Sequence, residues 1–133
     1  MFVDASAIVA ILTREVEADA LADRLDNASG CITSPVAVFE AALAICRKRR
    51  ASVSEARRDV GELLDLARVR VVAVTPADGD AALEAFVRYG KGQRNPAQLN
   101  LADCFAYAMA KNRAMLLLFK GEDFAMTDIA DSR

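Results

Sequence analysis

Three apolar segments of this chain each contain one carboxylate, and any fold that buries these segments must also accommodate the acids. An apolar N-terminal tripeptide leads directly to Asp4, and Asp103 is the only charged residue within residues 101–110. Glu40 lies inside an apolar helix predicted at residues 34–49. An ionised carboxylate among apolar side chains raises the free energy of the fold unless a cation compensates it. The pattern therefore predicts one cation that the three acids share.

The predicted helix at residues 34–49 shows the sharpest conflict between burial and charge. Ser34 is a typical N-cap and Pro35 a typical first helical residue. Helical spacing places four residues on one face, which we expect to be buried: Val36, Phe39, Glu40 and Leu43. Glu40 lies too deep in this helix to cap it. It therefore either serves the shared cation or pairs with a buried arginine.

Helix capping is a second explanation for the other two acids. Asp4 could cap the helix that follows it, and Asp103 lies three residues after Asn100, which is the spacing of a capping box. Asp78 lies at the same spacing after Thr75, and we interpret Asp78 as purely structural. Each acid alone is thus ambiguous, and the argument for a cation site depends on the set.

Short apolar strands alternate with helices along the chain. Strands are predicted at residues 1–4, 31–33, 70–74 and 115–119, and helices at 6–13, 16–27, 34–49, 54–67, 75–88 and 100–112. This order predicts an α/β fold with a mostly parallel sheet that helices cover on both faces. A length of 133 residues, 54% of them hydrophobic, suits a single domain at residues 1–133 with a substantial core.

The predicted topology brings several acids to one edge of the sheet. Binding sites of such sheets lie at the carboxyl ends of the strands. Asp4 directly follows one strand, Glu40 lies in the helix after the second, and Asp123 lies just past the last. Asp103 precedes its strand, so its arrival depends on how its helix lies across the sheet.

The absence of histidine excludes several kinds of site. Ser-His-Asp and Cys-His catalysis, histidine acid–base cleavage of RNA and histidine-ligated zinc all require an imidazole. Hydrolysis here must rely on carboxylates, lysines or a hard cation, and oxygen ligands favour Mg²⁺ or Mn²⁺. The three cysteines lack metal-binding spacing and are expected to be reduced, buried thiols.

Charge and hydropathy limit the partners and the location. A net charge of −2 disfavours a protein that coats DNA. No apolar run approaches the ~20 residues that span a bilayer. The N-terminus lacks the pattern of a signal peptide. We therefore expect no membrane association and a cytoplasmic location.

Two basic clusters and one serine are candidates for contacts with a substrate. Lys91 and Arg94 lie in a predicted loop shortly before Asp103, and we expect them to contact phosphate. Residues 47–50 are all basic, and we favour a solvated helix end that complements the helix dipole. Ser6 could hydrogen-bond an acid or a water at the end of the first strand, or simply be a small residue of a first helical turn.

Four segments resemble the PIN-domain ribonucleases and, within them, the VapC-type toxins of bacterial toxin–antitoxin pairs. They are VDASA at residues 3–7, SPVAVFEA at 34–41, LNLADCFAYA at 99–108 and LLFKGEDF at 117–124. They occur in the family's order and span essentially the whole chain. The resemblance implies a three-layer α/β/α PIN-like fold with a central, mostly parallel sheet. It also implies an endoribonuclease whose acidic site binds Mg²⁺, for which Mn²⁺ can substitute.

The same resemblance implies roles for individual acids. Asp4, Glu40 and Asp103 match the three principal acids of the family. We expect Asp4 and Asp103 to hold the metal, and Glu40 either to bind it directly or to position a bound water as base. Many relatives have a fourth acid in a Thr-x-Asp motif after the last main strand, which residues 120–123 replace here. The candidates for this fourth position are Asp123, which we favour, Glu122 and Asp128.

Protein partners are also implied by the resemblance. VapC-like toxins are typically held by a small antitoxin and commonly form homodimers. We expect the antitoxin to place an arginine among the acids. Apolar residues of the first two helices could line its groove, or else pack in the core or a homodimer interface: Ile8, Ile11, Leu12, Leu21 and Leu25.

Two other functions compete with the nuclease. One is a catalytically silent acidic α/β domain that acts only by binding a protein partner. The other is a phospho-acceptor receiver module, which would need adjacent acids after the first strand. Asp4 has no acidic neighbour, which disfavours the receiver.

Overall fold

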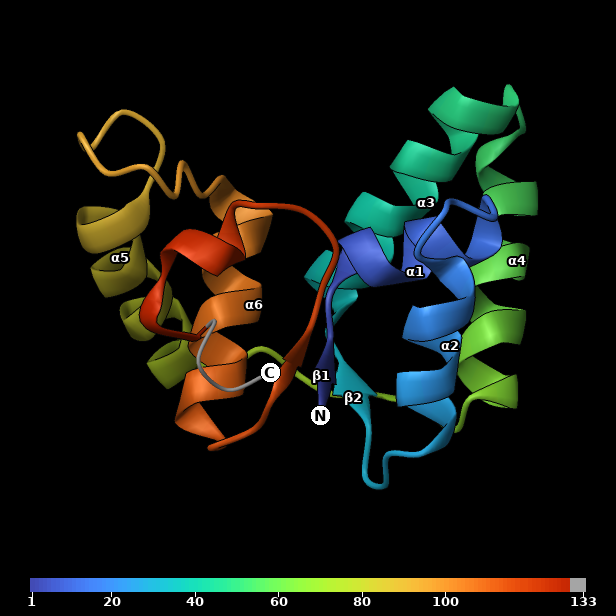
Figure 1. Ribbon diagram of the computed structural model, residues 1–133, viewed down its shortest axis with the longest axis horizontal. Helices are drawn as coiled ribbons and strands as arrows, with labels where there is room; N and C mark the ends of the chain where they lie inside the picture. The colour runs from blue at the N-terminus through green and yellow to red at the C-terminus, as the bar shows by residue number, and fades with distance from the viewer. Residues whose placement is uncertain (130–133) are drawn as a thin grey trace.

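A computed structural model describes residues 1–129 as a parallel sheet between two layers of helices (Figure 1). The strand order is β3-β2-β1-β4, with β1 (Phe2–Val3), β2 (Ile32–Thr33), β3 (Arg70–Val71) and β4 (Leu117–Leu118). The predicted three-layer α/β/α architecture is confirmed. The predicted single domain at 1–133 stays a prediction, because residues 130–133 lie outside the described part.

The six α-helices found within residues 1–129 are divided between the two faces. Four lie on one face: α1 (Ala5–Leu12), α2 (Ala18–Asp26), α3 (Pro35–Arg49) and α4 (Val53–Leu66). The opposite face is covered by α5 (Pro76–Tyr89) and α6 (Leu101–Asn112), and a 3₁₀ turn, η1 (Phe124–Met126), follows β4. None of the described helices has the length and apolar character needed to span a membrane.

Alternation along the strands creates two separate cores. Phe2, Ile32 and Leu117 pack with α5 and α6. Their neighbours Val3 and Leu118 pack with α1 to α4. Successive strand residues point to opposite faces, so even two-residue strands contribute to both cores.

The predicted strand at residues 70–74 is shorter than expected. Only Arg70 and Val71 form β3, and both are exposed because β3 is an edge strand. Val72 and Val74 are partly buried and pack against the core on the α5–α6 face. Their β-branched side chains thus serve packing rather than strand pairing.

The expected buried stripe of α3 is wrong. Phe39 is 67% exposed, and the buried residues of this helix are Ala37, Ala41, Ala42 and Ile45. Small alanines allow α3 to pack closely against α1 and α4, which places the larger Phe39 outside.

Of the alternatives for the apolar residues of α1 and α2, packing in the core is the one that the structure shows for most of them. Ile8, Leu21 and Leu25 are buried in the core. Ile11 and Leu12 are partly buried and pack against the same core. Of the cysteines, Cys31 and Cys104 are buried, Cys46 is half-buried, and all three are free thiols.

Asp78 has the structural role that its spacing predicts. Its carboxylate completes a capping box with Thr75 at the start of α5. It also accepts two hydrogen bonds, of 2.8 and 2.9 Å, from Arg113 just after α6. Asp78 is only 1% exposed, so this ion pair fixes α5 against α6 inside the protein.

We expect Asp78→Asn to lower the free energy of unfolding by about 3 kcal/mol, because it leaves the Arg113 guanidinium without its charged partner. The Arg113 hydrogen bonds hold the pKa of Asp78 below its ordinary value of 3.8. A depressed carboxyl pKa stabilises the fold above the unfolded pKa and loses that effect as the pH falls. The difference in melting temperature should therefore shrink below pH 3.8. A difference that is absent at pH 7 would contradict this assignment.

Candidate active site

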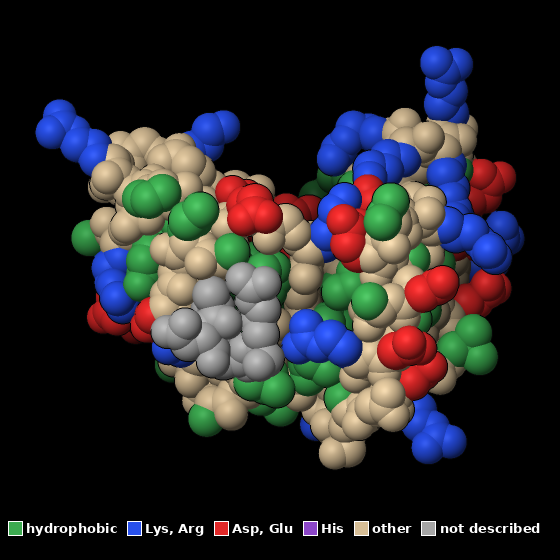
Figure 2. Space-filling model, viewed as in Figure 1, with side chains coloured by type: hydrophobic (Ala, Val, Ile, Leu, Met, Phe, Trp, Pro, Cys, Tyr) green, Lys and Arg blue, Asp and Glu red, His purple; other side chains and the backbone are tan. Residues whose placement is uncertain are grey.

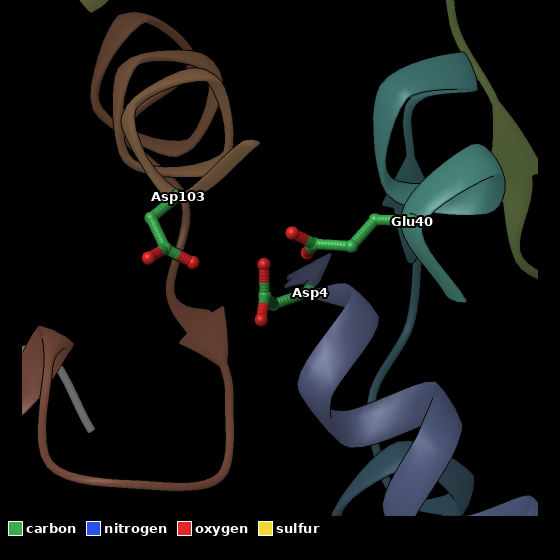
Figure 3. Close-up of side chains that lie close together, drawn as sticks. All are labelled: Asp4, Glu40 and Asp103. Carbon is green, nitrogen blue, oxygen red and sulfur yellow. The ribbon is translucent and has the colours of Figure 1, made fainter. Parts of the chain in front are cut away.

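Three carboxylates from distant parts of the chain converge at the carboxyl edge of the sheet. Asp4 follows β1, Glu40 lies in α3 and Asp103 lies in the first turn of α6. One oxygen of each lies within 4.8 Å of an oxygen of each of the others. Figure 3 shows the three side chains pointing toward one another from their separate elements. Asp103 arrives because α6 begins at the edge where the parallel strands end.

Local sequence rules place two of these acids. Asp4 is the N-cap of α1, and its Oδ2 accepts a hydrogen bond of 2.9 Å from the Ser6 backbone N–H. Asp103 Oδ2 accepts a hydrogen bond of 3.1 Å from the Asn100 backbone N–H, which closes a capping box at the start of α6. Asp4 and Asp103 can therefore cap their helices and belong to the acidic cluster at the same time, because the capping hydrogen bonds use only Oδ2 of each carboxylate.

The remaining oxygens are available to a ligand. Within residues 1–129, Oδ1 of Asp103 accepts no hydrogen bond, and both hydrogen bonds from Ser6 to Asp4 end on Oδ2. In the same range, no lysine or arginine forms an ion pair with Glu40. The buried Glu–Arg pair, the structural alternative for Glu40, is thus absent from the described part of the chain.

Burial and mutual repulsion make the ionised cluster costly. Burial raises the pKa of Asp4 above its ordinary value, although hydrogen bonds from Ser6 oppose this. Burial and then the charge of Asp4 raise the pKa of Glu40. Burial, together with the charges of Asp4, Glu40 and Asp123, raises the pKa of Asp103 to about 7. A divalent cation would remove this repulsion, and carboxylate oxygens are the ligands that Mg²⁺ and Mn²⁺ prefer.

Asn100 was predicted only as a helix cap, and it also contacts a second acid of the cluster. Its Oδ1 accepts a hydrogen bond of 2.9 Å from the Asp103 backbone N–H. Its side chain also hydrogen-bonds Glu40, which opposes the rise of the Glu40 pKa. Asn100 thus connects α6 to α3 across the cluster. The signal for it was its position three residues before Asp103.

The three candidates for the fourth acid lie in different surroundings. Asp123 lines the same pocket as the three converging acids, a pocket of about 340 Å³. Glu122 is exposed and does not line this pocket. Asp128 accepts a hydrogen bond of 2.6 Å from the Tyr107 hydroxyl and forms an ion pair with Lys111.

Ser6 lies among the acids. Its hydroxyl donates a hydrogen bond of 2.6 Å to Asp4 and accepts one of 3.0 Å from the Lys120 backbone N–H. Ser6 therefore joins the ends of the neighbouring strands β1 and β4. These bonds orient the Asp4 carboxylate.

The cations nearest the acids are not the ones that the sequence favoured. Lys91 and Arg94 are exposed in the segment before α6 and do not line the acidic pocket. Arg47, Lys48 and Lys120 do line it. Sequence reasoning favoured a solvated helix end for the first two and did not consider Lys120, since only the fold places the end of α3 beside the end of β4.

Comparison with known proteins identifies the family. A model of the PIN domain matches residues 1–130. A VapC ribonuclease of Rhizobium meliloti is 41% identical, over 96% of this chain and 98% of the relative. A ribonuclease VapC of Mycolicibacterium smegmatis is 42% identical over 98% of both chains.

A solved structure supports the fold independently. The crystal structure of Mycobacterium tuberculosis VapC20, described as a toxin that cleaves the sarcin–ricin loop, superposes with a TM-score of 0.69. The match covers 93% of this chain and 92% of that one at 20% identity, so it bears on the fold alone. The family model and the near-full-length relatives show that this chain belongs to the PIN-domain family, among the VapC ribonucleases.

Proposed function

We propose that this protein is a toxin of the VapC kind, an endoribonuclease that depends on Mg²⁺ and that a cognate antitoxin neutralises. The observation that carries this proposal is the convergence of Asp4, Glu40 and Asp103 within 4.8 Å, without an ion-pair partner in the described residues. The relatives named ribonucleases support the reaction class. We place the protein in the cytoplasm, because the proposed RNA substrate and the proposed antitoxin would both be found there.

The donor set fits a hard divalent cation. Asp4 and Asp103 each direct a carboxylate oxygen into the cluster and would hold Mg²⁺, or Mn²⁺ in its place. When bound, such a cation polarises a phosphate oxygen and lowers the pKa of a coordinated water. Glu40 lies beside these ligands and can accept a proton from a water that attacks phosphorus. Asp123 lines the same pocket and is our fourth acid.

The proposed metal site predicts that Asp4→Asn and Asp103→Asn each abolish Mg²⁺-dependent cleavage of RNA. Both variants keep an amide oxygen that can accept the capping hydrogen bonds, so both should fold. In EDTA at pH 8 they should melt at or above the temperature of the wild type, because a repelling charge has been removed. Cleavage of an RNA mixture and thermal melting test this together. Asp80→Asn, which removes an exposed carboxylate of α5, is the matched control and should cleave normally.

Full activity of either variant at matched purity would contradict the assigned ligands. If the wild type cleaves no RNA when Mg²⁺ or Mn²⁺ is added in the absence of EDTA, the proposed nuclease activity is contradicted instead. That result would favour the catalytically silent binding domain.

A second prediction concerns Glu40. Glu40→Gln should lose cleavage and melt near or above the wild type, because a half-buried charge without an ion-pair partner is replaced by a neutral group. Activity at pH 8 and melting in EDTA are the measurements. Retained activity with a large loss of melting temperature would assign Glu40 a structural role instead.

The antitoxin has a candidate groove that differs from the one expected. Apolar residues line a groove between α3 and α4, among them the exposed Phe39 and Val53 and the half-buried Leu43. This groove shares α3 with Glu40, so an apolar segment seated there could direct an arginine to the acids. The proposed homodimer has a separate candidate surface on α5 and α6, where Leu83, Val87 and Leu101 are exposed.

We expect the small protein encoded beside this chain to bind it and suppress cleavage. Phe39→Ser should weaken that binding while leaving RNA cleavage intact, because Phe39 is exposed and outside the acidic pocket. Co-purification and a cleavage assay of the complex measure both effects. If the neighbour neither binds nor inhibits, and expression of this chain alone does not slow growth, the toxin proposal fails while the nuclease can stand.

A further inference from the structure

Positive charge lies beside the acids, at the same edge of the sheet. Arg47 and Lys48 from the end of α3, and Lys120 after β4, line the pocket that contains the acids. Figure 2 shows acidic and basic side chains gathered at the hollow between the two groups of helices. An acidic cluster repels the phosphodiester backbone, so a bound RNA strand needs cations on either side of the site of cleavage.

Glu15 holds two of these cations in place. Its carboxylate lies 2.7 Å from Lys48 Nζ and 3.3 Å from Lys120 Nζ. The backbone of Glu15 is itself fixed, because its N–H donates a hydrogen bond of 3.0 Å to the Ala10 carbonyl. Glu15 thereby joins the turn after α1, the end of α3 and the segment after β4.

Lys120 is tied to the acids through its backbone as well. Its N–H donates to the Ser6 hydroxyl, which in turn donates to the Asp4 carboxylate. Two hydrogen bonds therefore connect the Lys120 backbone to a proposed metal ligand. This chain of contacts fixes the position of the Lys120 backbone relative to Asp4.

Both lysines retain the capacity to bind a further anion. An ammonium has three donors, and Lys48 uses one of them on Glu15. Lys120 lies 3.3 Å from Glu15 and 3.8 Å from Glu17, so its ammonium keeps at least one donor free for an anion. The side chains of Lys48 and Lys120 are 47% and 35% exposed, respectively. An exposed ion pair of this kind contributes little to stability, so stability alone does not account for a carboxylate that gathers two lysines at the rim of the acidic pocket.

We infer that Lys48 and Lys120 bind backbone phosphates of the RNA strand beside the cleaved bond, and that Glu15 is the positioning residue that holds both lysines. This inference rests on the proposed nuclease function and adds to it the path of the substrate backbone. It assigns the contact to these two lysines rather than to Lys91 and Arg94, which lie outside the pocket lining.

The test measures kcat, KM and metal-free binding of a fluorescent single-stranded RNA that the wild type cleaves. Lys48→Gln and Lys120→Gln should each raise KM several-fold with little change in kcat. Each should lower the slope of log affinity against log salt by roughly 0.7, the value for one lost phosphate contact on a single strand. The matched control is Lys111→Gln, which removes a lysine of similar exposure that pairs with Asp128 outside the pocket. It should change none of these quantities.

Glu15→Gln separates positioning from simple charge. Removing a negative charge from the rim would by itself tighten RNA binding. If Glu15 positions the lysines, the variant should instead raise KM and weaken binding, with an unchanged salt slope because both lysines remain. A melting temperature above the assay temperature for every variant confirms that the fold is retained.

The outcomes distinguish this inference from the function on which it rests. Normal cleavage by the wild type, with KM and salt slope unchanged in both lysine variants, overturns the lysine assignment alone. Tighter RNA binding by Glu15→Gln overturns its positioning role. Absence of metal-dependent cleavage by the wild type overturns the nuclease, and the binding measurement then still decides whether the lysines contact RNA.

Discussion

Electrostatic repulsion among three carboxylates is the constraint on which this structure depends. Asp4, Glu40 and Asp103 lie within 4.8 Å of one another, and burial raises the pKa of each. The fold tolerates the cluster because capping bonds hold Oδ2 of the two aspartates and Asn100 hydrogen-bonds Glu40. A protein of marginal stability keeps such an arrangement where function uses it, and a divalent cation would relieve it.

The rest of the fold supplies the rigidity that the cluster requires. Asp4 follows the central strand β1, which pairs with both β2 and β4. The two cores pack against opposite faces of the sheet. The ion pair of Asp78 with Arg113 fixes α5 against α6. Asp78 and Asp103 share the capping-box spacing, yet Arg113 lowers the pKa of Asp78 while burial raises that of Asp103. The same local motif thus stabilises helix packing at one site and brings a carboxylate into the proposed metal site at the other, according to its partners.

Charge on the rim of the pocket complements the acids at its centre. Glu15 gathers Lys48 and Lys120 at the edge where the strands end, within reach of a nucleic acid that approaches the acids. A chain with a net charge of −2 can therefore bind a polyanion through a local arrangement of cations. Net charge describes the whole surface, whereas the proposed contact with RNA involves only this small part of it.

Sequence by itself determined the α/β class, the helix caps at Asp4 and Ser34, the structural role of Asp78 and the arrival of Asp4 and Glu40 at one edge of the sheet. These follow from local rules, since capping, periodicity and the edge of a parallel sheet depend on nearby residues and topology. Only the tertiary structure decided which face of α3 is buried, that Ile8 and Leu21 are core residues and that Lys120 lies beside Glu15. Those features depend on how helices pack and on contacts between residues over 100 positions apart, such as Ser6 with Lys120. Such contacts cannot be predicted from neighbouring residues, because they form only when the sheet brings the ends of its strands together.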